Sequence, residues 1–477
     1  MPFFYKPDDG YTADFIPFYW NDSYHLFYLK DYRDVDKHGE GTPWFQIVTR
    51  DFVNFEDWGE AIPRGAQGTQ DLWIFTGSAI EANSEFSIFY TAHNHHMMEQ
   101  GKPCQAVTLA TSPDLRTWTK HPEVMMYAPG DKGYEPHDWR DPFVFWNEEA
   151  GEYWMLLAAR LSAIKPSRNR GCTALMASPD LKTWELRDPF WAPNEYFTHE
   201  CPDLFKMGDW WYLVYSTFTE RCVTHYRMSR SINGPWLAPA NDAFDTRAYY
   251  AAKTASDGDK RYIFGWLATR DGEKDEGGWQ WGGCLVAHEI TQQPDGTLDV
   301  RVPESVPAVF TEPHSLSSKP MLGKWDIGGG HIASASVGEQ SMITLGEMPQ
   351  ECMIETEITY HPGTYSFGLL LRADENLENY YQLRFEPANS RMVFDRWPRP
   401  GDVPFMFERP LEMTPGKPIK LRVIVDGTAV VAYANNKIAL SCRMYNHPTG
   451  ALGLFVTEGE ADFGGVSVRT QQVSNRA

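Results

Sequence analysis

Short, aromatic-rich apolar runs recur along the first part of the chain, each about the length of one β-strand. They begin at Tyr24 ("YHLFYL"), Phe86 ("FSIFYTA"), Tyr153 ("YWMLLAA"), Trp210 ("WWYLVYS") and Arg261 ("RYIFGWL"). Apolar runs of this length that are rich in aromatic residues are typical of buried strands. No long helical periodicity interrupts them. The pattern therefore predicts β-structure and disfavours an α/β barrel.

A second motif follows each of the first four runs and sets a period. It is a polar turn that closes on tryptophan: "TRDFVNFEDW" ends at Trp58, "TSPDLRTW" at Trp118, "ASPDLKTW" at Trp184 and "MSRSINGPW" at Trp236, at intervals of 60, 66 and 52 residues. A unit of this size cannot bury both of its faces alone. Five four-stranded sheets packed radially solve this problem. We therefore predict a five-bladed β-propeller over residues 1–304.

Beyond residue 304 the pattern changes. The segment "SVPAVFTEPHSLSSKPMLGKW" has the proline and serine content of a linker, which we place at 305–322. Further on, "CMIETEITYH", "YSFGLLLRAD" and "IKLRVIVDGTAVVAYANN" alternate polar and apolar residues and contain turn signals. We predict a C-terminal β-sandwich over 323–477, which makes the whole chain all-β.

Composition limits the cellular location and the kinds of partner that we expect for the protein. The chain has 477 residues and a formal net charge of −21, so a nucleic acid would be repelled. The 7 cysteines are scattered without CxxC spacing, and no apolar stretch reaches membrane-spanning length. The N-terminal "MPFFYKPDDG" lacks the basic and apolar regions of a signal peptide. We expect a cytoplasmic protein with reduced thiols and no membrane partner; a homo-oligomer is left open.

Acidic residues occupy matching places in three of the predicted blades. The first strand of a propeller blade lines the central channel, and here it precedes the aromatic second strand. Counting back from the aromatic runs reaches Asp14 and Glu200 at ten residues and Asp141 at twelve. The same count in the other two blades reaches "TGSA", with Thr76 and Ser78, and "YYAAKT", with Tyr249 and Lys253. These hydroxyls and this amine suit ligand binding.

Carboxylates that converge on one axis repel each other, so at least one should have a raised pKa and keep a proton near neutrality. Glycoside hydrolysis needs a protonated and an ionised carboxyl group together. Arg140 beside Asp141 should keep that carboxylate ionised and available to sugar hydroxyls. Asp188, in a second "RDPF", falls at an outer strand, and we interpret it as structural. The spacing shows no calcium loop, and we expect neither a metal nor a cofactor.

The motifs "WRDPFVFW", "HECPDLF", "FTGSA" and "YYAAKT", with the "SPDLRTW" repeat, resemble glycoside hydrolase family 32, the β-fructosidases related to invertase, inulinase and levanase. The resemblance covers the propeller and extends to "VDGTAVVAYANN" in the sandwich. It implies a retaining β-fructofuranosidase for a small carbohydrate, with Glu200 as acid/base, Asp141 as transition-state stabiliser and Asp14 as nucleophile. A different furanosidase, a fructosyltransferase and a non-catalytic carbohydrate-binding propeller remain alternatives.

The segment around Asp14 departs from the family. The family usually has Trp-Met-Asn-Asp-Pro-Asn-Gly there, whereas this chain has "YTADFIPFYW", with Ala13 and Phe15 beside the acid. Loss of a polar partner to a substrate hydroxyl weakens binding of that substrate. We therefore expect sucrose and long inulin to be poor substrates and a small, unusual fructoside to be preferred. The charged loop at 270–281 should crowd the pocket and so also favour a small substrate.

Loops that leave the second strands return to the face that carries the carboxylates. We expect Trp73, His93 and Trp281 to contact sugar there. His93, His95 and His96 fall within four residues, and so short a segment rarely supplies a whole metal site without further ligands. The Asp14 and Glu200 carboxyl groups should lie about 5–6 Å apart, the separation that suits a retaining mechanism.

Overall fold

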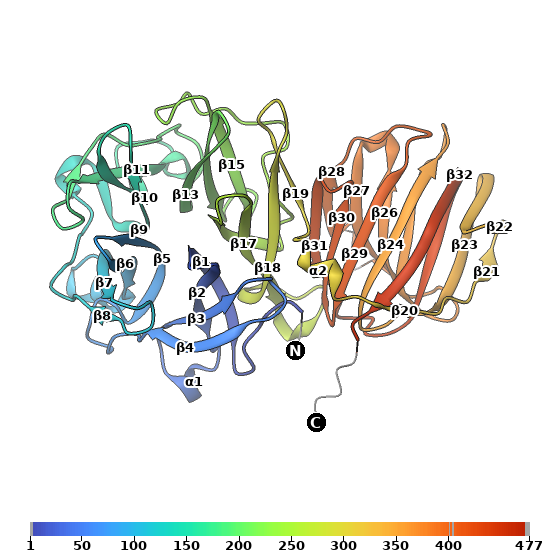
Figure 1. Cartoon of the computed structure of the whole chain (residues 1–477), viewed down its shortest axis with the longest axis horizontal. Coiled ribbons are helices and arrows are strands. Elements are labelled where there is room, and N and C mark those ends of the chain that lie inside the picture. The colour runs from blue at the N-terminus through green and yellow to red at the C-terminus, as the bar shows by residue number, and fades with distance from the viewer. Residues whose placement is uncertain (1–2, 400, 403–404, 473–477) are drawn as a thin grey trace.

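The computed structural model describes residues 3–399, 401–402 and 405–472, and it contains two β-rich bodies (Figure 1). A ring of blades forms the N-terminal body, and packed strands form the C-terminal body. The predicted all-β fold, a propeller followed by a β-sandwich, is confirmed. Positions 1–2, 400, 403–404 and 473–477 of the predicted domains lie outside the described residues. None of the helices in the described part has the length and apolar character that a membrane crossing requires.

Each blade is an antiparallel sheet, and the first strands of neighbouring blades contact each other around the ring. The blades are β1 (Tyr11–Trp20), β2 (Ser23–Asp31), β3 (Trp44–Thr49) and β4 (Glu56–Ile62); β5 (Trp73–Ala82), β6 (Glu85–His93), β7 (Gln105–Ser112) and β8 (Thr119–Lys120); β9 (Tyr134–Asn147), β10 (Glu152–Leu161), β11 (Gly171–Ser178) and β12 (Glu185–Leu186); β13 (Glu200–Met207), β14 (Trp210–Thr217) and β15 (Val223–Ser229); and β16 (Tyr249–Ser256), β17 (Arg261–Arg270), β18 (Trp279–Gln292) and β19 (Leu298–Arg301). Short helices lie between these strands: α1 (Val35–His38), η1 (His95–Gln100), η2 (Gly130–Lys132), η3 (Ser167–Asn169) and η4 (Asp271–Glu273). In blade four, isolated bridges at Leu237 and Ala243 stand where a fourth strand would run.

The repeated polar turn has a local chemical cause. The Asp114 carboxylate accepts hydrogen bonds from the backbone N–H groups of Arg116 (2.9 Å) and Thr117 (2.7 Å). Leu115, between Asp114 and Arg116, has a left-handed φ of 62°. Asp180 makes the corresponding contacts one blade later. Aspartate side chains stabilise such turns by satisfying backbone donors, so the sequence repeat is a repeat of turn chemistry.

The C-terminal body is built around one long strand. Its elements are α2 (Ser305–Ala308), β20 (Glu312–His314), β21 (Lys319–Leu322), β22 (Trp325–Gly328), β23 (His331–Glu347), β24 (Glu351–Tyr360), β25 (Ser366–Ala373), β26 (Tyr380–Glu386), η5 (Pro387–Asn389), β27 (Arg391–Trp397), β28 (Phe407–Pro410), β29 (Ile419–Asp426), β30 (Ala429–Ala434), β31 (Ile438–Arg443) and β32 (Ala451–Thr470). Strand β32 pairs with β25 over its first part and with β24 over its second. Gly459, with a φ of 115°, lies between the two parts, where a Cβ would come within 2.5 Å of Thr364 Cα. The segment 305–322, expected as a linker, contains two strands that pair with β32 and β23.

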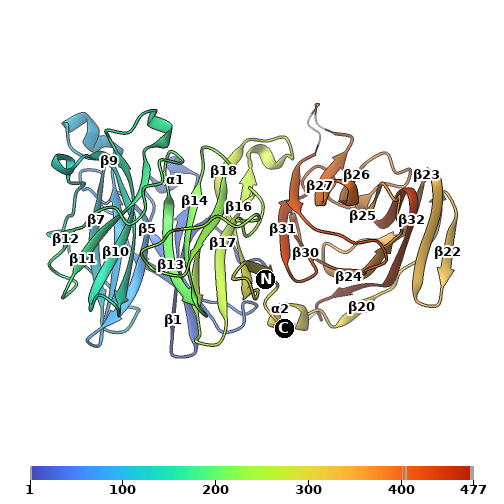
Figure 2. The same cartoon turned by 90° about the horizontal axis from the view of Figure 1, so that it is seen from above.

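The sandwich holds a loop of the propeller, next to which it lies in both views (Figures 1 and 2). Asp275, which is 2% exposed, lies in the loop between β17 and β18. Its carboxylate accepts hydrogen bonds from the Tyr381 hydroxyl (2.7 Å), the Arg396 guanidinium (2.9 Å) and the Tyr445 backbone N–H (3.0 Å). All three donors belong to the C-terminal body. Because charge-assisted bonds to a buried carboxylate are strong, the sandwich anchors the segment that leads into Trp281.

Candidate active site

The same irregularity occurs on the first strand of every blade. The pairing register with the second strand shifts at Asp14, at Thr76, and next to Asp141, Cys201 and Ala251. All of these except Thr76 have a positive φ, between 32° and 59°. A bulge adds one residue to a strand and re-aims its side chains. Positive φ at a non-glycine residue costs about 1–3 kcal/mol, and such strain gathers at functional sites.

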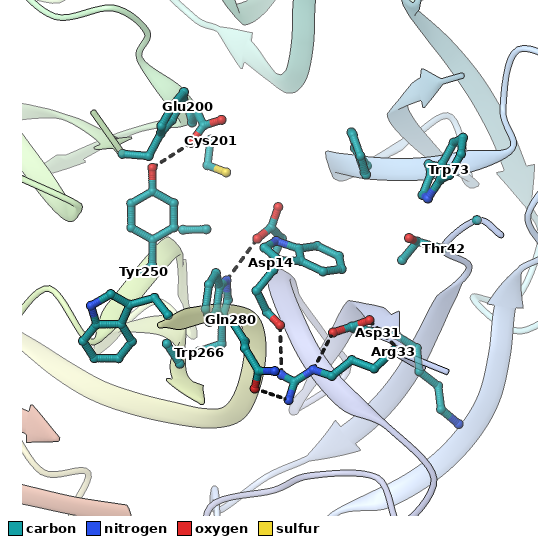
Figure 3. Close-up of a pocket in the computed structure, with 18 of the residues that line it drawn as sticks. Asp14, Asp31, Arg33, Thr42, Trp73, Glu200, Cys201, Tyr250, Trp266 and Gln280 are labelled. Carbon is teal, nitrogen blue, oxygen red and sulfur yellow. Dashed lines mark hydrogen bonds and ion pairs between the residues drawn. The ribbon is translucent and has the colours of Figure 1, made fainter. Parts of the chain in front are cut away.

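The bulges surround a cavity of about 990 Å³. Asp14, Asp141 and Glu200 line it, and they come from blades one, three and four. Asp14 and Glu200 reach into this space from different strands (Figure 3). The structure therefore brings together the three acids that the sequence placed on one ring.

Two donors from other blades hold the Asp14 carboxylate. The Thr76 hydroxyl donates to Oδ2 (2.7 Å), and the Trp266 indole N–H donates to Oδ1 (3.0 Å). Burial is the main cause that raises the pKa of Asp14 to about 7. The negative charges of Asp141 and Glu200 act in the same direction, whereas the two hydrogen bonds oppose it. Asp14 therefore titrates near neutral pH.

The Glu200 carboxylate also has a donor on each oxygen. Arg140 donates to Oε1 (3.1 Å), and the Tyr250 hydroxyl donates to Oε2 (2.7 Å). Burial raises the pKa of Glu200, and the charge of Arg140 opposes that rise. A phenolic hydroxyl both donates and accepts. Tyr250 can thus donate to the ionised carboxylate and accept from the protonated one.

Asp141 occupies a more cationic environment. The backbone N–H of Cys201 donates to its Oδ2 (2.9 Å), and Arg140 Nε lies 3.7 Å from the same oxygen. Burial raises the pKa of Asp141, but Arg140 is the strongest opposing influence. Arg140 is itself fixed by Asp138 (2.6 Å) and by the Thr198 hydroxyl (2.9 Å). This guanidinium therefore joins two of the acids and orients both.

Carboxyl groups that line one cavity do not all ionise readily at neutral pH, because their negative charges repel one another, as those of Asp141 and Glu200 raise the pKa of Asp14. Their protons belong to the group as a whole rather than to single residues. Such a site can keep one carboxyl group protonated beside another that is ionised. This is the combination that general acid catalysis and nucleophilic attack at a glycosidic bond require.

Three further residues with expected sugar contacts reach the site. Arg140, Trp73 and Trp281 line the cavity, and Trp281 is 38% exposed at its rim. Thr76 lies behind the cavity wall and acts on it through its hydrogen bond to Asp14.

Ser78 and Lys253 connect blades instead of lining the cavity. The Ser78 hydroxyl accepts a hydrogen bond from the Val144 backbone N–H (2.9 Å). The Lys253 ammonium donates to the Gly77 carbonyl (3.0 Å) and is 2% exposed. Both side chains lie beyond the bulges, where the strands pack against each other.

Tyr249 and His93 also fail to reach the cavity, contrary to the expectation. The Tyr249 hydroxyl donates to the Ile263 carbonyl (3.3 Å) within the core. The His93 ring stacks on Phe75 with 4.7 Å between centroids, and burial lowers the pKa of His93 to about 4. Strand alternation directs Tyr249 into the core, whereas His93 shares a face with its pair partner Trp73 and stacks on Phe75 without lining the cavity.

The sequence did not single out the two aromatic donors. Tyr250 contacts Glu200, and Trp266 contacts Asp14. They are directly opposite each other on β16 and β17, at the edge of the bulge. "YYAAKT" offered two adjacent tyrosines, and only the bulge determines which of them faces the axis.

Arg33 was missed as well, and it organises the rim (Figure 3). Its guanidinium donates to Asp31 (3.2 Å), to Gln280 (2.7 Å) and to the Trp281 carbonyl (3.1 Å). It also stacks over the Tyr11 ring at 3.5 Å. Arg33 therefore ties the end of the blade-five loop to blade one, while Asp275 ties the same loop to the sandwich.

Ala13 and Phe15, the departures beside Asp14, are both fully buried. The Phe15 ring packs against Tyr28 with centroids 5.7 Å apart, and neither residue lines the cavity. The bulky ring thus does not form a wall of the pocket. What remains of that argument is the missing polar group at Ala13 and the loop at 270–281.

The model of the glycosyl hydrolases family 32 N-terminal domain matches residues 5–296. The chain belongs to this family. The model of the family 32 C-terminal domain matches residues 332–470. Membership makes the chain a glycosidase, a retaining hydrolase of β-fructofuranosides.

Some relatives in family 32 match nearly the whole chain and others match about half of it. A sucrose-6-phosphate hydrolase of Escherichia coli is 24% identical over 485 residues, which cover 96% of this chain and 92% of that protein. A levanbiose-producing levanase of Bacillus subtilis is 28% identical over 261 residues, 52% of this chain and 43% of that protein. Exo-inulinase from Aspergillus awamori has the same fold, with a TM-score of 0.72 at 17% identity over 99% of both chains.

Proposed function

We propose that Glu200 is the general acid/base, Asp14 the nucleophile and Asp141 the transition-state stabiliser for hydrolysis of short β-fructofuranosides. The observation that carries the assignment is the convergence of these acids on one cavity from three blades. Among the described residues, the donors to Asp14 are the neutral groups of Thr76 and Trp266, which leave its carboxylate nucleophilic. Asp141 lies near Arg140 and accepts from a backbone N–H, which suits a carboxylate that stays in place and binds hydroxyls.

The reaction then has two displacements. In the first, a carboxylate oxygen of Asp14 attacks the anomeric carbon while the Glu200 proton passes to the leaving oxygen, which gives a fructosyl-enzyme. In the second, Glu200 takes a proton from water, and the resulting hydroxide releases fructose from Asp14. Tyr250 can hydrogen-bond to Glu200 in both protonation states because its hydroxyl donates and accepts. The separation of about 5–6 Å between the Asp14 and Glu200 carboxyl groups stays a prediction.

Short substrates are favoured by the rim. The blade-five loop is anchored at Asp275 and tied to Arg33, so Trp281 is held over one side of the cavity. A polymer would have to pass this fixed loop. A panel of sucrose, 1-kestose, inulin and levan tests the proposal, and hydrolysis of the polymers at rates equal to those of the short sugars would contradict it.

A phosphorylated sugar is a second candidate. Exposed Arg247 lines the cavity, where it could meet a phosphate, and the relatives include sucrose-6-phosphate hydrolases. Sucrose and sucrose 6-phosphate assayed side by side distinguish the two substrates. A preference for the phosphorylated sugar that is lost in Arg247→Gln would favour this candidate.

The acid role of Glu200 has its own test. Glu200→Gln should lose turnover of sucrose but keep the first step on an aryl fructoside, because an activated leaving group needs no proton. Glu195→Gln, a change at a half-exposed neighbour, is the matched control. Equal loss on both substrate types would argue against the acid role. In water–methanol mixtures, retention predicts methyl β-fructofuranoside as the transfer product.

A cytoplasmic location and the oligomeric state are further proposals. The seven cysteines are free, and six of them are buried, which suits a reducing compartment. Cell fractionation tests the location. Light scattering of the purified protein tests whether it forms a homo-oligomer.

A further inference from the structure

Two loops of neighbouring blades bring two imidazoles and a carboxylate together at the rim of the cavity. Glu40 follows α1, and His95 and His96 begin η1. One ligand atom from each of the three lies within 4.8 Å of the others, and His96 Nε2 is 2.8 Å from Glu40 Oε2. We propose that Glu40, His95 and His96 form a binding site for a divalent transition-metal ion, with Zn²⁺ as the best match.

The Glu40 loop is held in its shape before any ion binds. Arg64 reaches under it and donates to the carbonyls of Gly39 (3.2 Å), Gly41 (3.0 Å) and His38. Gly41 has a φ of 98°, and a Cβ there would lie 2.2 Å from the Leu72 carbonyl oxygen. Since only glycine fits that approach, the backbone on both sides of Glu40 is fixed.

The histidine loop is fixed by a single buried side chain. Asn94 is fully buried, and its Oδ1 accepts from the His96 backbone N–H (3.0 Å). Its amide donates to the carbonyls of Gln67 (2.9 Å) and Thr69 (2.7 Å). The Asn94 amide N–H groups thus bind the preceding loop, and its carbonyl oxygen holds the start of η1. Both ligand-bearing segments are therefore preorganised, and only side-chain rotation is needed to complete the site.

The ligand types select the ion. Imidazole suits zinc, copper and nickel, whereas magnesium and calcium prefer oxygen ligands alone. Bonds of about 2.0–2.2 Å in a tetrahedral arrangement place the ligand atoms roughly 3.3 Å apart, and the partly exposed side chains can close to that distance. Three protein ligands leave the fourth position to water.

Two other partly exposed histidines in the described part of the chain each pair with a single carboxylate and do not form a three-ligand cluster. His121 pairs with Glu123 (3.1 Å) and His331 with Asp462 (3.4 Å), but each of those pairs has one imidazole. Among the described residues, three such ligand atoms lie this close together at Glu40, His95 and His96 alone. The sequence disfavoured a metal here because three histidines within four residues rarely reach one ion without further ligands. The structure supplies a further ligand, Glu40, from the neighbouring blade.

An ion at this site would act on the cavity. Glu40 and Trp73 both line it, and the Trp73 ring lies 4.5 Å from the His95 ring. A bound ion would neutralise Glu40 and clamp the rims of blades one and two together. Since the acids lie deeper in the cavity, the ion should change KM for substrates that extend to the rim and leave kcat on a small aryl fructoside unchanged.

Calorimetry with ZnCl₂ on tag-free, reduced protein tests the site. We expect one ion per chain. Loss of a residue that only supports a metal ligand weakens metal binding by about 10–100-fold. Each of the ligand variants Glu40→Gln, His95→Ala and His96→Ala should weaken binding by more than that. Arg64→Lys, which loosens the Glu40 loop without touching a ligand, should weaken binding within that 10–100-fold range. His121→Ala is the matched control and should bind as the unaltered chain does.

Fluorescence supplies a second measurement. Cu²⁺ bound beside His95 should quench Trp73, and Trp73→Phe should remove that part of the quenching while binding persists. Absence of Zn²⁺ binding to the unaltered, folded protein would overturn the proposal. Equal affinity in the unaltered chain and the three ligand variants, or loss of binding in His121→Ala, would overturn it as well.

Discussion

Replacing Thr76 with valine removes one hydrogen bond from Asp14 with almost no change in shape. Thr76 is fully buried, and its hydroxyl lies 2.7 Å from Asp14 Oδ2. A hydrogen bond to an ionised group contributes about 1.5–3 kcal/mol, and one pKa unit corresponds to about 1.4 kcal/mol. Because the ionised carboxylate loses more than the protonated form, the pKa of Asp14, raised by burial to about 7, should rise by a further 1–2 units, roughly.

The pH profile of kcat/KM measures this change, because it reports the ionisations of the free enzyme. The proposed nucleophile must be ionised, so the acidic limb of the profile should move to higher pH by about 1–2 units in Thr76→Val. Below that limb, kcat/KM should fall by about ten- to hundredfold, and above it the activity should recover.

Thr76→Ser is the control, since it keeps the hydroxyl and should keep the profile. Circular dichroism and thermal melting should show that the valine variant folds, at a cost of about 1 kcal/mol. An acidic limb that stays in place or moves to lower pH in a folded Thr76→Val protein would refute the reasoning. The limb would then belong to another group.

Three other predictions follow from the same contacts. Tyr250→Phe removes a donor to ionised Glu200, so the alkaline limb of kcat/KM should move to higher pH by about one unit; an unmoved limb would contradict the acid role. The raised pKa of Asp14 means that its contribution to stability is present at low pH and is lost as the pH rises through about 7. Asp14→Asn should thus raise the free energy of unfolding by up to about 4 kcal/mol at pH 8 and by little below pH 4, measured by urea denaturation; an equal gain at both pH values would exclude this cause. Asp275→Asn should free the loop that holds Trp281 and raise KM for 1-kestose by about tenfold, with little effect on an aryl fructoside; equal effects on both substrates would show that the loop does not act at the rim.

The ring of acids was predictable because its sequence signals are local. Strands β1 and β2 are joined by the two residues Asn21 and Asp22, both with positive φ, as tight hairpins require. Strands β13 and β14 are also joined by two residues, so the same offset of ten found Asp14 and Glu200. The turn in blade three is longer, and Asp141 appears at twelve for that reason.

The remaining contacts were not predictable from local pattern. One extra residue in each inner strand changes which side chain faces the axis, so Tyr250 lines the cavity while Tyr249 packs in the core. Contacts such as Trp266 with Asp14 join residues that are far apart in the sequence. They depend on how blades pack against each other, and alternation within one strand carries no information about that packing.

The five bulges also allow the residues at the centre of the propeller to change independently of the blades. Regular pairing resumes after each bulge, so a side chain there can be exchanged without shifting the rest of its strand. Three of the five bulge residues, Thr76, Cys201 and Ala251, are not acids, and two of these, Cys201 and Ala251, line the cavity with the acids. A lineage under selection, or a protein engineer, can therefore explore new chemistry by single substitutions at these points. The blades would remain the same scaffold throughout.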